Sequence, residues 1–272
     1  MVKAIYASVG KKGLKLFSKE KERIPEVVRK IIEESDIILE VLDARFPEET
    51  RNKKIEEFIK KQGKKIIYVL NKSDLIESTK KPFLFPWIYV SSKKRTGGRA
   101  LRDMLKRESR KIEKDKTTVG VIGYPNTGKS ALINLLIGRS SARFSAEAGM
   151  TKGVQKLRLS QRILLLDSPG VIPPEEYSTT GKSSKKHVEI GVKTYDKIKE
   201  PDIFVAELMR KYSQIIENFY KIPSNGDSEI LLEELGKRKR FFKKGGEIDS
   251  DKTARLILKD WQFGNIKIEL KN

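Results

Sequence analysis

An eight-residue segment near the middle of the chain has the composition of a loop that binds phosphate groups. It fits the pattern G-x-x-x-x-G-K-[ST] and reads Gly123, Tyr124, Pro125, Asn126, Thr127, Gly128, Lys129 and Ser130. Glycines let backbone N–H groups surround phosphate oxygens, the lysine reaches the β- and γ-phosphates, and the hydroxyl ligates Mg²⁺. We therefore expect these residues and the adjoining Ala131 to bind a nucleotide, with Lys129 as a catalytic charge.

A second polar segment, Asn71, Lys72, Ser73 and Asp74, precedes the phosphate loop in the chain and follows an apolar run. Its pattern, N-K-x-D, often marks only a turn. However, a carboxylate at its last position can accept two hydrogen bonds from N1 and N2 of guanine, and adenine cannot supply both. We therefore expect Asp74 to select guanine.

A third polar segment, Ser91, Ser92 and Lys93, also follows an apolar run. It would bring a small polar side chain and a backbone N–H toward guanine O6, although an ordinary loop would have the same composition. We expect these three residues to belong to the nucleotide site.

Two segments downstream of the phosphate loop carry candidate metal ligands. Asp167 begins a D-x-x-G motif, so its carboxylate is expected to hold Mg²⁺ and the Gly170 N–H to meet the γ-phosphate. Thr151 lies in a glycine-flanked loop that can close onto the same ion and phosphate. Ser130, Thr151 and Asp167 are thus the predicted Mg²⁺ ligands.

Apolar, β-prone runs alternate with helical patterns through the first part of the chain. The expected strands are residues 37–42, 65–70, 87–90, 118–122, 154–159 and 162–166, and the expected helices are 52–62, 98–114 and 129–137. Such alternation indicates an α/β fold with a doubly wound, mostly parallel sheet. Ligands of these folds bind beyond the carboxyl ends of the strands. The polar clusters that begin at Asp43, Asn71, Ser91 and Gly123 all lie at such ends.

The strand pattern ends near residue 182, and helical patterns follow at residues 188–198, 203–220, 229–242 and 250–262. We therefore predict a nucleotide-binding domain at residues 1–182 and a small all-helical domain at residues 183–272.

The chain of 272 residues carries 58 lysines and arginines against 37 acidic residues, a net charge of +21. This charge favours a polyanionic partner such as nucleic acid, although a surface charged as in thermophiles would have the same composition. There is no cysteine, which excludes disulfides and thiolate metal sites. With no apolar run long enough for a membrane span, we expect a soluble, cytoplasmic protein without a membrane partner. The sequence does not indicate an oligomeric state, and we expect a monomer.

The chain resembles the circularly permuted GTPases of the YlqF/YawG type, which are ribosome-assembly factors. The resemblance rests on the rotated motif order, on Asp43-Ala44-Arg45-Phe46-Pro47 with Arg51-Asn52, and on residues 244–261. It implies a circularly permuted Ras-like P-loop GTPase whose helical C-terminal domain, residues 183–272, binds RNA or the ribosome. It also implies GTP/GDP and Mg²⁺ as ligands, hydrolysis of GTP, and ribosomal RNA or a precursor of the large ribosomal subunit as partner. Spacing alone gives no chemistry for residues 43–47.

The group that orients the attacking water is not evident. Ras-like proteins have a glutamine after the D-x-x-G motif, but this chain has Val171, whose side chain cannot orient water. Asn126 resembles the asparagine that binds an activating K⁺ in related GTPases, and Thr151 is a competing candidate for positioning the water. We therefore expect slow intrinsic hydrolysis that K⁺ and the ribosome stimulate. A GTP-regulated protein-binding switch and a GTPase that handles tRNA are alternatives.

Overall fold

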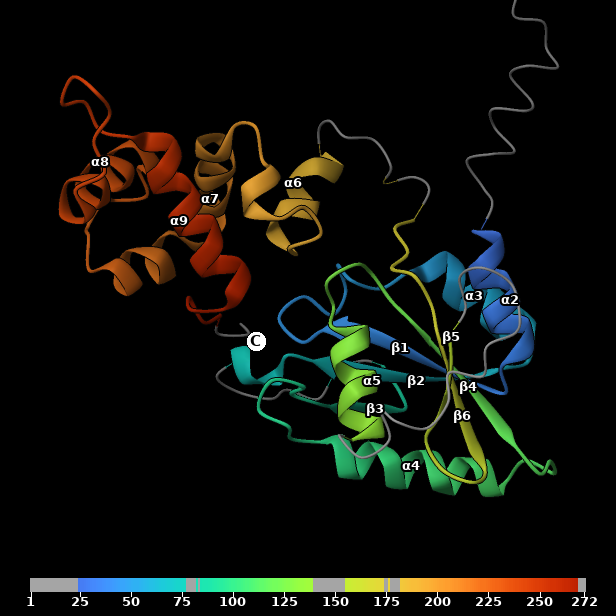
Figure 1. Ribbon diagram of the computed structural model, residues 1–272. Coiled ribbons are helices and arrows are strands. Elements are labelled where there is room, and N and C mark those ends of the chain that lie inside the picture. Colours follow the sequence, from blue (N-terminus) through green and yellow to red (C-terminus); the bar gives the residue numbers. More distant parts are fainter. Residues whose placement is uncertain are drawn as a thin grey trace, which may run out of the picture.

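The computed structural model describes residues 24–76, 82, 84–138, 155–173, 176 and 182–268. Its centre is a six-stranded sheet in the order β3-β2-β1-β4-β6-β5 (Figure 1). The strands are β1 (Ile37–Asp43), β2 (Lys65–Asn71), β3 (Trp87–Tyr89), β4 (Thr117–Ile122), β5 (Gln155–Arg158) and β6 (Ile163–Asp167). Only the β5–β6 pair is antiparallel, so the predicted mostly parallel sheet is confirmed.

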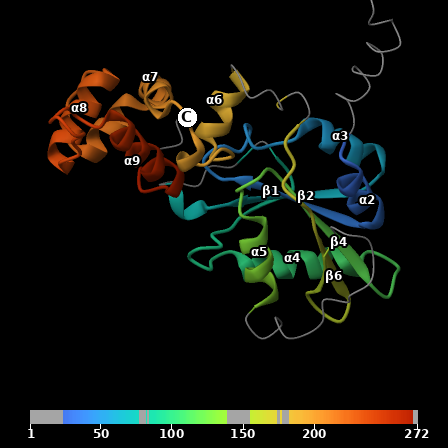
Figure 2. The same ribbon diagram turned by 45° about the horizontal axis from the view of Figure 1, so that its top comes forward.

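Helices cover both faces of the sheet, as Figure 2 shows: α2 (Glu26–Glu34) and α3 (Lys53–Lys61) on one face, and α4 (Gly98–Arg110) and α5 (Lys129–Ile137) on the other. Successive side chains of β1 point to opposite faces of the sheet and therefore belong to two different hydrophobic cores. Ile37 and Leu39 pack with α4 and α5, whereas Ile38 and Leu42 pack with α2 and α3. Helix α2 was not among the predicted elements, although its buried residues Val28, Ile31 and Ile32 have helical spacing.

A helical region follows the sheet and consists of α6 (Lys182–Glu189), a 3₁₀ turn (Tyr195–Lys197), α7 (Pro201–Tyr220), α8 (Ser228–Lys239) and α9 (Ser250–Phe263). The aspartates at positions 227 and 249 accept backbone N–H bonds and cap α8 and α9. Across the described ranges, no helix is long and apolar enough to span a membrane.

The predicted helix at residues 188–198 is wrong, because α6 ends at Glu189. Gly191 follows with a φ of 75°, which a continuing helix does not allow. The Trp261 indole donates to the Glu189 carbonyl, and the Gln262 amide donates to the carbonyls of Val188 and Lys193. Side chains of α9 thus take the carbonyls that a longer helix would use itself.

The helical region packs against loops at the carboxyl ends of the strands. Its core includes Phe46, which follows β1, and Tyr124, which follows β4. The rings of Phe46 and Trp261 lie 6.1 Å apart. Ile76, in the segment after β2, forms an isolated parallel bridge with Ile268, so the end of the helical region also pairs with this segment.

Candidate nucleotide-binding site

The phosphate loop lies between β4 and α5, as the sequence predicts. Gly123 adopts a φ of 149°, and a Cβ there would lie 2.4 Å from the Val41 carbonyl oxygen. Gly128 adopts a φ of 92°, and its Cβ would lie 2.3 Å from the Asn71 amide nitrogen. Both positions therefore require glycine, because the loop approaches β1 and the Asn71 loop closely.

Lys129 lies across this loop and is 7% exposed. Its ammonium donates to the carbonyl oxygens of Gly123 (3.1 Å) and Tyr124 (2.9 Å). Burial lowers the pKa of Lys129 to about 8, although the nearby Asp167 carboxylate opposes this shift. The structure therefore holds a poorly solvated positive charge where a phosphate would bind.

We expect nucleotide affinity to fall as the pH rises above about 8. Only the protonated Lys129 attracts phosphate, and its pKa of about 8 in the free protein should rise when phosphate is bound. The affinity for nucleotide should then be highest below pH 8 and fall by up to about tenfold per pH unit above it. Calorimetric titration with GDP at pH 7, 8 and 9 measures this. A Lys129→Arg variant keeps its charge, so any slope that it retains belongs to the ligand; identical slopes in both proteins would contradict the prediction.

A cavity of about 620 Å³ opens beside the phosphate loop. It is lined by Pro125, Asn126, Lys129, Ser130, Asp167, Ser168, Pro169 and Gly170. The Oδ1 atom of Asp167 is buried without a hydrogen-bond partner, and burial raises the pKa of this carboxyl. An unsatisfied carboxylate oxygen beside the exposed Ser130 suits an oxygen-ligated cation such as Mg²⁺. Thr151, the third predicted ligand, lies outside the described residues.

The D-x-x-G segment docks directly on the phosphate loop. A Cβ on Gly170 would lie 2.8 Å from the Cα of Pro125, so only glycine allows this approach. The next residue, Val171, donates its N–H to the Gly123 carbonyl at 3.1 Å. The Val171 side chain is 4% exposed in the core with α2 and α3, so it does not face the cavity.

Asn71 holds three loops together. Its amide nitrogen donates to the Thr127 carbonyl of the phosphate loop at 2.9 Å. Its amide oxygen accepts from the N–H (3.2 Å) and the hydroxyl (2.9 Å) of Ser92. The predicted contact segments therefore meet, and the side-chain hydrogen bonds of Asn71 position the loops.

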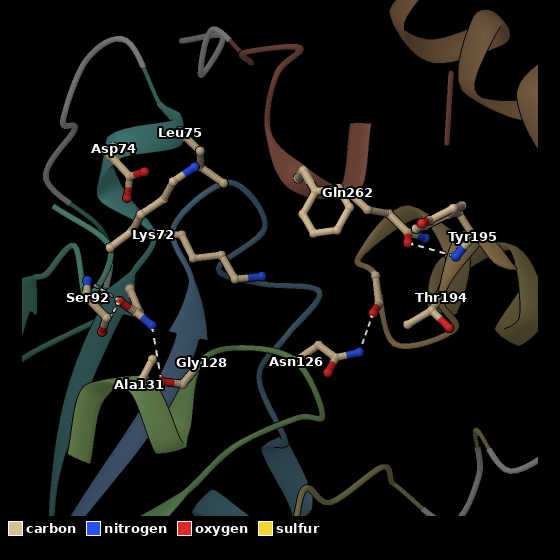
Figure 3. A pocket seen from close by; sticks show the side chains of 14 residues that line it. Lys72, Asp74, Leu75, Ser92, Asn126, Gly128, Ala131, Thr194, Tyr195 and Gln262 are labelled. Carbon is tan, nitrogen blue, oxygen red and sulfur yellow. Dashed lines mark hydrogen bonds between the residues drawn. The ribbon is translucent and has the colours of Figure 1, made fainter. Parts of the chain in front are cut away.

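Five of the residues predicted to read the base line a cavity of about 550 Å³: Asn71, Lys72, Asp74, Ser92 and Lys93. Ser73 and Ser91, which were predicted with them, are not part of its lining. Asp74 accepts a hydrogen bond from the Ser91 hydroxyl, which fixes the carboxylate at this cavity. In Figure 3, Lys72, Asp74 and Ser92 lie on one side, Gly128 and Ala131 below, and Thr194, Tyr195 and Gln262 on the opposite side. The last three residues come from the helical region, and no sequence pattern indicated them.

Asn126 borders both cavities, which therefore adjoin each other. Its amide nitrogen donates to the Gly191 carbonyl of the helical region at 2.8 Å. The predicted K⁺ ligand thus has a protein partner in this structure. One side of the combined site carries Asp74 and the other carries Lys129.

The segment after β1, for which spacing gave no chemistry, forms a buried ion cluster. The register of β1 and β2 sets Asp43 beside Asn71, so Lys72 can reach Asp43 with a 2.8 Å contact. Arg45 donates to both oxygens of Asp43, at 3.0 and 2.7 Å, and to the Trp261 carbonyl at 2.9 Å. Burial opposes ionisation of Asp43, but Arg45 and Lys72 hold its pKa well below its usual range. The cluster joins the loop after β2 to α9.

We expect Arg45→Lys to lower the free energy of unfolding by about 2 kcal/mol or more, because a lysine cannot replace the planar fork of donors. The melting temperature should fall by at least about 4 °C. Arg210→Lys is the matched control, since Arg210 is 73% exposed and its ion pair with Glu207 contributes little. Equal melting temperatures for both variants in calorimetry would refute a structural role for this cluster.

A second polar cluster joins the phosphate loop to α6. Glu176 accepts hydrogen bonds from the Tyr124 hydroxyl (2.9 Å) and the Lys186 ammonium (2.6 Å), and it lies 3.1 Å from His187. Burial raises the pKa of Glu176, but His187 and Lys186 outweigh it and lower the pKa to about 2. The Tyr124 side chain therefore connects the loop to α6.

A parallel sheet, a glycine-rich loop between a strand and a helix, and an aspartate at the end of a neighbouring strand define a P-loop nucleotide-binding protein. The segment predicted to read the base, Asn71 to Asp74, precedes the phosphate loop in the chain, so the motif order is rotated. The model of the family described as "50S ribosome-binding GTPase" matches residues 118–232.

Known proteins are similar to this chain in sequence or in fold. The GTP-binding protein MJ1464 of Methanocaldococcus jannaschii is 37% identical over 264 residues, which cover 93% of this chain and 69% of that protein. Nucleolar GTP-binding protein 2 of Saccharomyces cerevisiae is 32% identical over 92% of this chain and 54% of that protein. GDP-bound YlqF of Thermotoga maritima superposes with a TM-score of 0.63 at 20% identity, over 90% of this chain and 98% of YlqF.

The chain belongs to the family of circularly permuted GTPases of the YlqF/YawG type. The resemblance and the fold expected from the sequence are thereby confirmed. The chain spans about half the length of the nucleolar relatives that it matches.

Proposed function

We propose that this protein binds GTP in the combined site and hydrolyses it to GDP and phosphate with Mg²⁺. One observation carries the proposal: Asp74 and Lys129 line two adjoining cavities that share Asn126. Guanine would lie at the Asp74 cavity and the phosphates at the Lys129 cavity. Asp74 would accept bonds from guanine N1 and N2, as the motif predicts.

Each residue of the phosphate cavity has a defined task in this proposal. Lys129 would exchange its two loop carbonyls for the β- and γ-phosphate oxygens, and the loop N–H groups would bind the remaining oxygens. Ser130 and Asp167, with the predicted Thr151, would hold Mg²⁺, which supplies neutralisation of the phosphate charge. The Gly170 N–H would bind the γ-phosphate.

Hydrolysis is expected to be slow without a partner, because the buried Val171 side chain cannot orient water. We propose that K⁺ at Asn126 and a bound ribosomal particle supply the missing stabilisation, with Thr151 as the competing candidate for positioning water. The Asn126–Gly191 bond would have to open for K⁺ to bind. Equal turnover in Na⁺ and K⁺ buffers, with and without ribosomes, would contradict this part.

We propose ribosomal RNA, within a precursor of the large subunit, as the partner of a monomeric chain. The net charge of +21 and the names of the matched family and relatives support this choice. Helix α4 adds a basic surface with Arg99, Lys106, Arg107 and Arg110. The protein would then act where ribosomes are assembled, which is the cytoplasm in a cell without a nucleolus.

The test has two stages. Calorimetric titration should give much tighter binding of GTP than of ATP; equal affinities would overturn the proposed nucleotide. Co-sedimentation with large-subunit particles, with GDP or a non-hydrolysable GTP analogue, should depend on the nucleotide and weaken log-linearly with salt. Salt-insensitive capture of a protein would favour the protein-binding switch, and stronger binding to tRNA than to subunits would favour tRNA handling.

A further inference from the structure

The cavity that contains Asp74 has an outer wall made by the helical region. Its lining includes Gly191, Thr194 and Tyr195 from the turn after α6, and Gln262 and Phe263 from the end of α9. Phe263 is 56% exposed, an unusual setting for a large apolar side chain at a helix end. The rings of Tyr195 and Phe263 meet edge to face with their centroids 6.1 Å apart. An exposed aromatic ring with a supporting ring therefore borders the base-reading cavity.

Several contacts fix this wall relative to the base-reading loop. A Cβ on Gly264 would lie 2.4 Å from Leu75, so the chain after α9 lies directly on the neighbour of Asp74. Arg45, which is bound to Asp43 of the buried cluster, donates to the carbonyl of Trp261, two residues before Phe263. The side chains of residues 262 and 263 are therefore presented to the cavity by a constrained backbone.

The polar groups of this wall are largely committed to the protein. The Gln262 side-chain oxygen accepts the Tyr195 N–H at 3.0 Å, and its nitrogen donates to the carbonyls of Val188 in α6 and of Lys193 in the turn after α6. Gln262 thus holds the turn in place. Both N–H groups of its side chain already donate to protein carbonyls, so neither is available to the edge of a base. The chemistry that the wall offers is an aromatic face, which suits the flat face of a purine.

We propose that Phe263 stacks on the guanine base, so that the helical region completes the nucleotide pocket. This inference rests on the proposed function of the site, because Asp74 binds the edge of the base while Phe263 covers its face. Tyr195 supports the Phe263 ring and is a positioning residue. Nucleotide binding and docking of the helical region are then linked, and each stabilises the other by the same factor.

The test compares Phe263→Ala with Phe242→Ala, whose phenylalanine is similarly exposed (51%) but does not line the cavity. Calorimetry should show about tenfold weaker GDP binding for Phe263→Ala, since aromatic stacking contributes that much per base. Phe263→Ala should also bind IDP about tenfold more weakly than the parent chain does, because IDP lacks the 2-amino group but keeps the purine face. Phe263→Trp should bind GDP within about twofold of the parent, because it restores an aromatic face.

Two results would overturn the inference: Phe263→Ala binding GDP within about twofold of the parent chain, or Phe263→Leu restoring full affinity, because apolar bulk without an aromatic face would then suffice. Matching melting temperatures for the Phe263 and Phe242 variants ensure that the comparison concerns binding and not folding. Failure of the proposed function has a different signature, since the unmodified chain would then bind ATP as tightly as GTP.

Discussion

Replacing Asp74 by asparagine should weaken GDP binding by about 100-fold or more and leave ATP binding unchanged. The carboxylate would accept two hydrogen bonds from guanine, and bonds to a charged group contribute about 1.5–3 kcal/mol each. An amide presents one oxygen and one NH₂ group, so one of its atoms faces a guanine donor without accepting from it. Competition titrations with GDP and ATP measure the ratio of affinities.

The loop around Asp74 should survive this change, because an asparagine oxygen can still accept the Ser91 hydroxyl. Ser91→Ala is the matched control: it removes that bond but keeps the carboxylate, so guanine preference should be retained with a smaller loss of affinity. A GDP-to-ATP ratio in Asp74→Asn equal to that of the parent chain would eliminate Asp74 as the selecting group.

Replacing Lys129 by alanine should lower kcat by about 10²–10³, the usual loss when one group that stabilises transition-state charge is removed. The charge of Lys129 is buried, so its attraction for phosphate is less weakened by water than that of a surface lysine. Single-turnover GTP hydrolysis at saturating nucleotide measures the chemical step. Lys94→Ala, an exposed lysine outside both cavity linings, controls for the loss of one positive charge.

The same variant should not melt at a lower temperature than the parent chain. Burial disfavours the charged form of Lys129, as its pKa of about 8 indicates, so removing it relieves a desolvation cost. An inactive and equally stable protein is the expected combination. If Lys129→Ala were inactive only because it unfolds, the assignment of Lys129 to phosphate binding would lose its support.

Local patterns predicted the features that local residues determine. The strands before Asn71 and Gly123 are short apolar runs followed by polar turns, and each motif lies within eight consecutive residues. Each motif could therefore be assigned to the same edge of the sheet from the end of the strand before it. No long-range contact was needed for this prediction. The rotated order did not disturb this reasoning, because the position of a strand end in the sheet does not depend on the order of the strands in the chain.

Features that depend on distant residues were not predictable in this way. Arg45 meets the carbonyl of Trp261 from 216 positions away, and nothing near Arg45 in the sequence indicates that partner. The end of α6 is likewise set by distant residues, because Trp261 and Gln262 donate hydrogen bonds to carbonyls at the end of this helix. The helical pattern beyond residue 189 therefore gave a wrong prediction. The sequence around Phe263 is that of an ordinary helix end. Only the cavity that Phe263 lines together with Asp74 indicates a role in binding.

The bridge between Ile76 and Ile268 attaches the last described residues of the helical region to the segment after β2, separately from the covalent connection between β6 and α6. The hydrogen bonds from Arg45 to Trp261 and from Asn126 to Gly191 hold the same region at other points. A body held at several separated points cannot swing about any one of them. A change in the orientation of the helical region would therefore have to break contacts in several places at once.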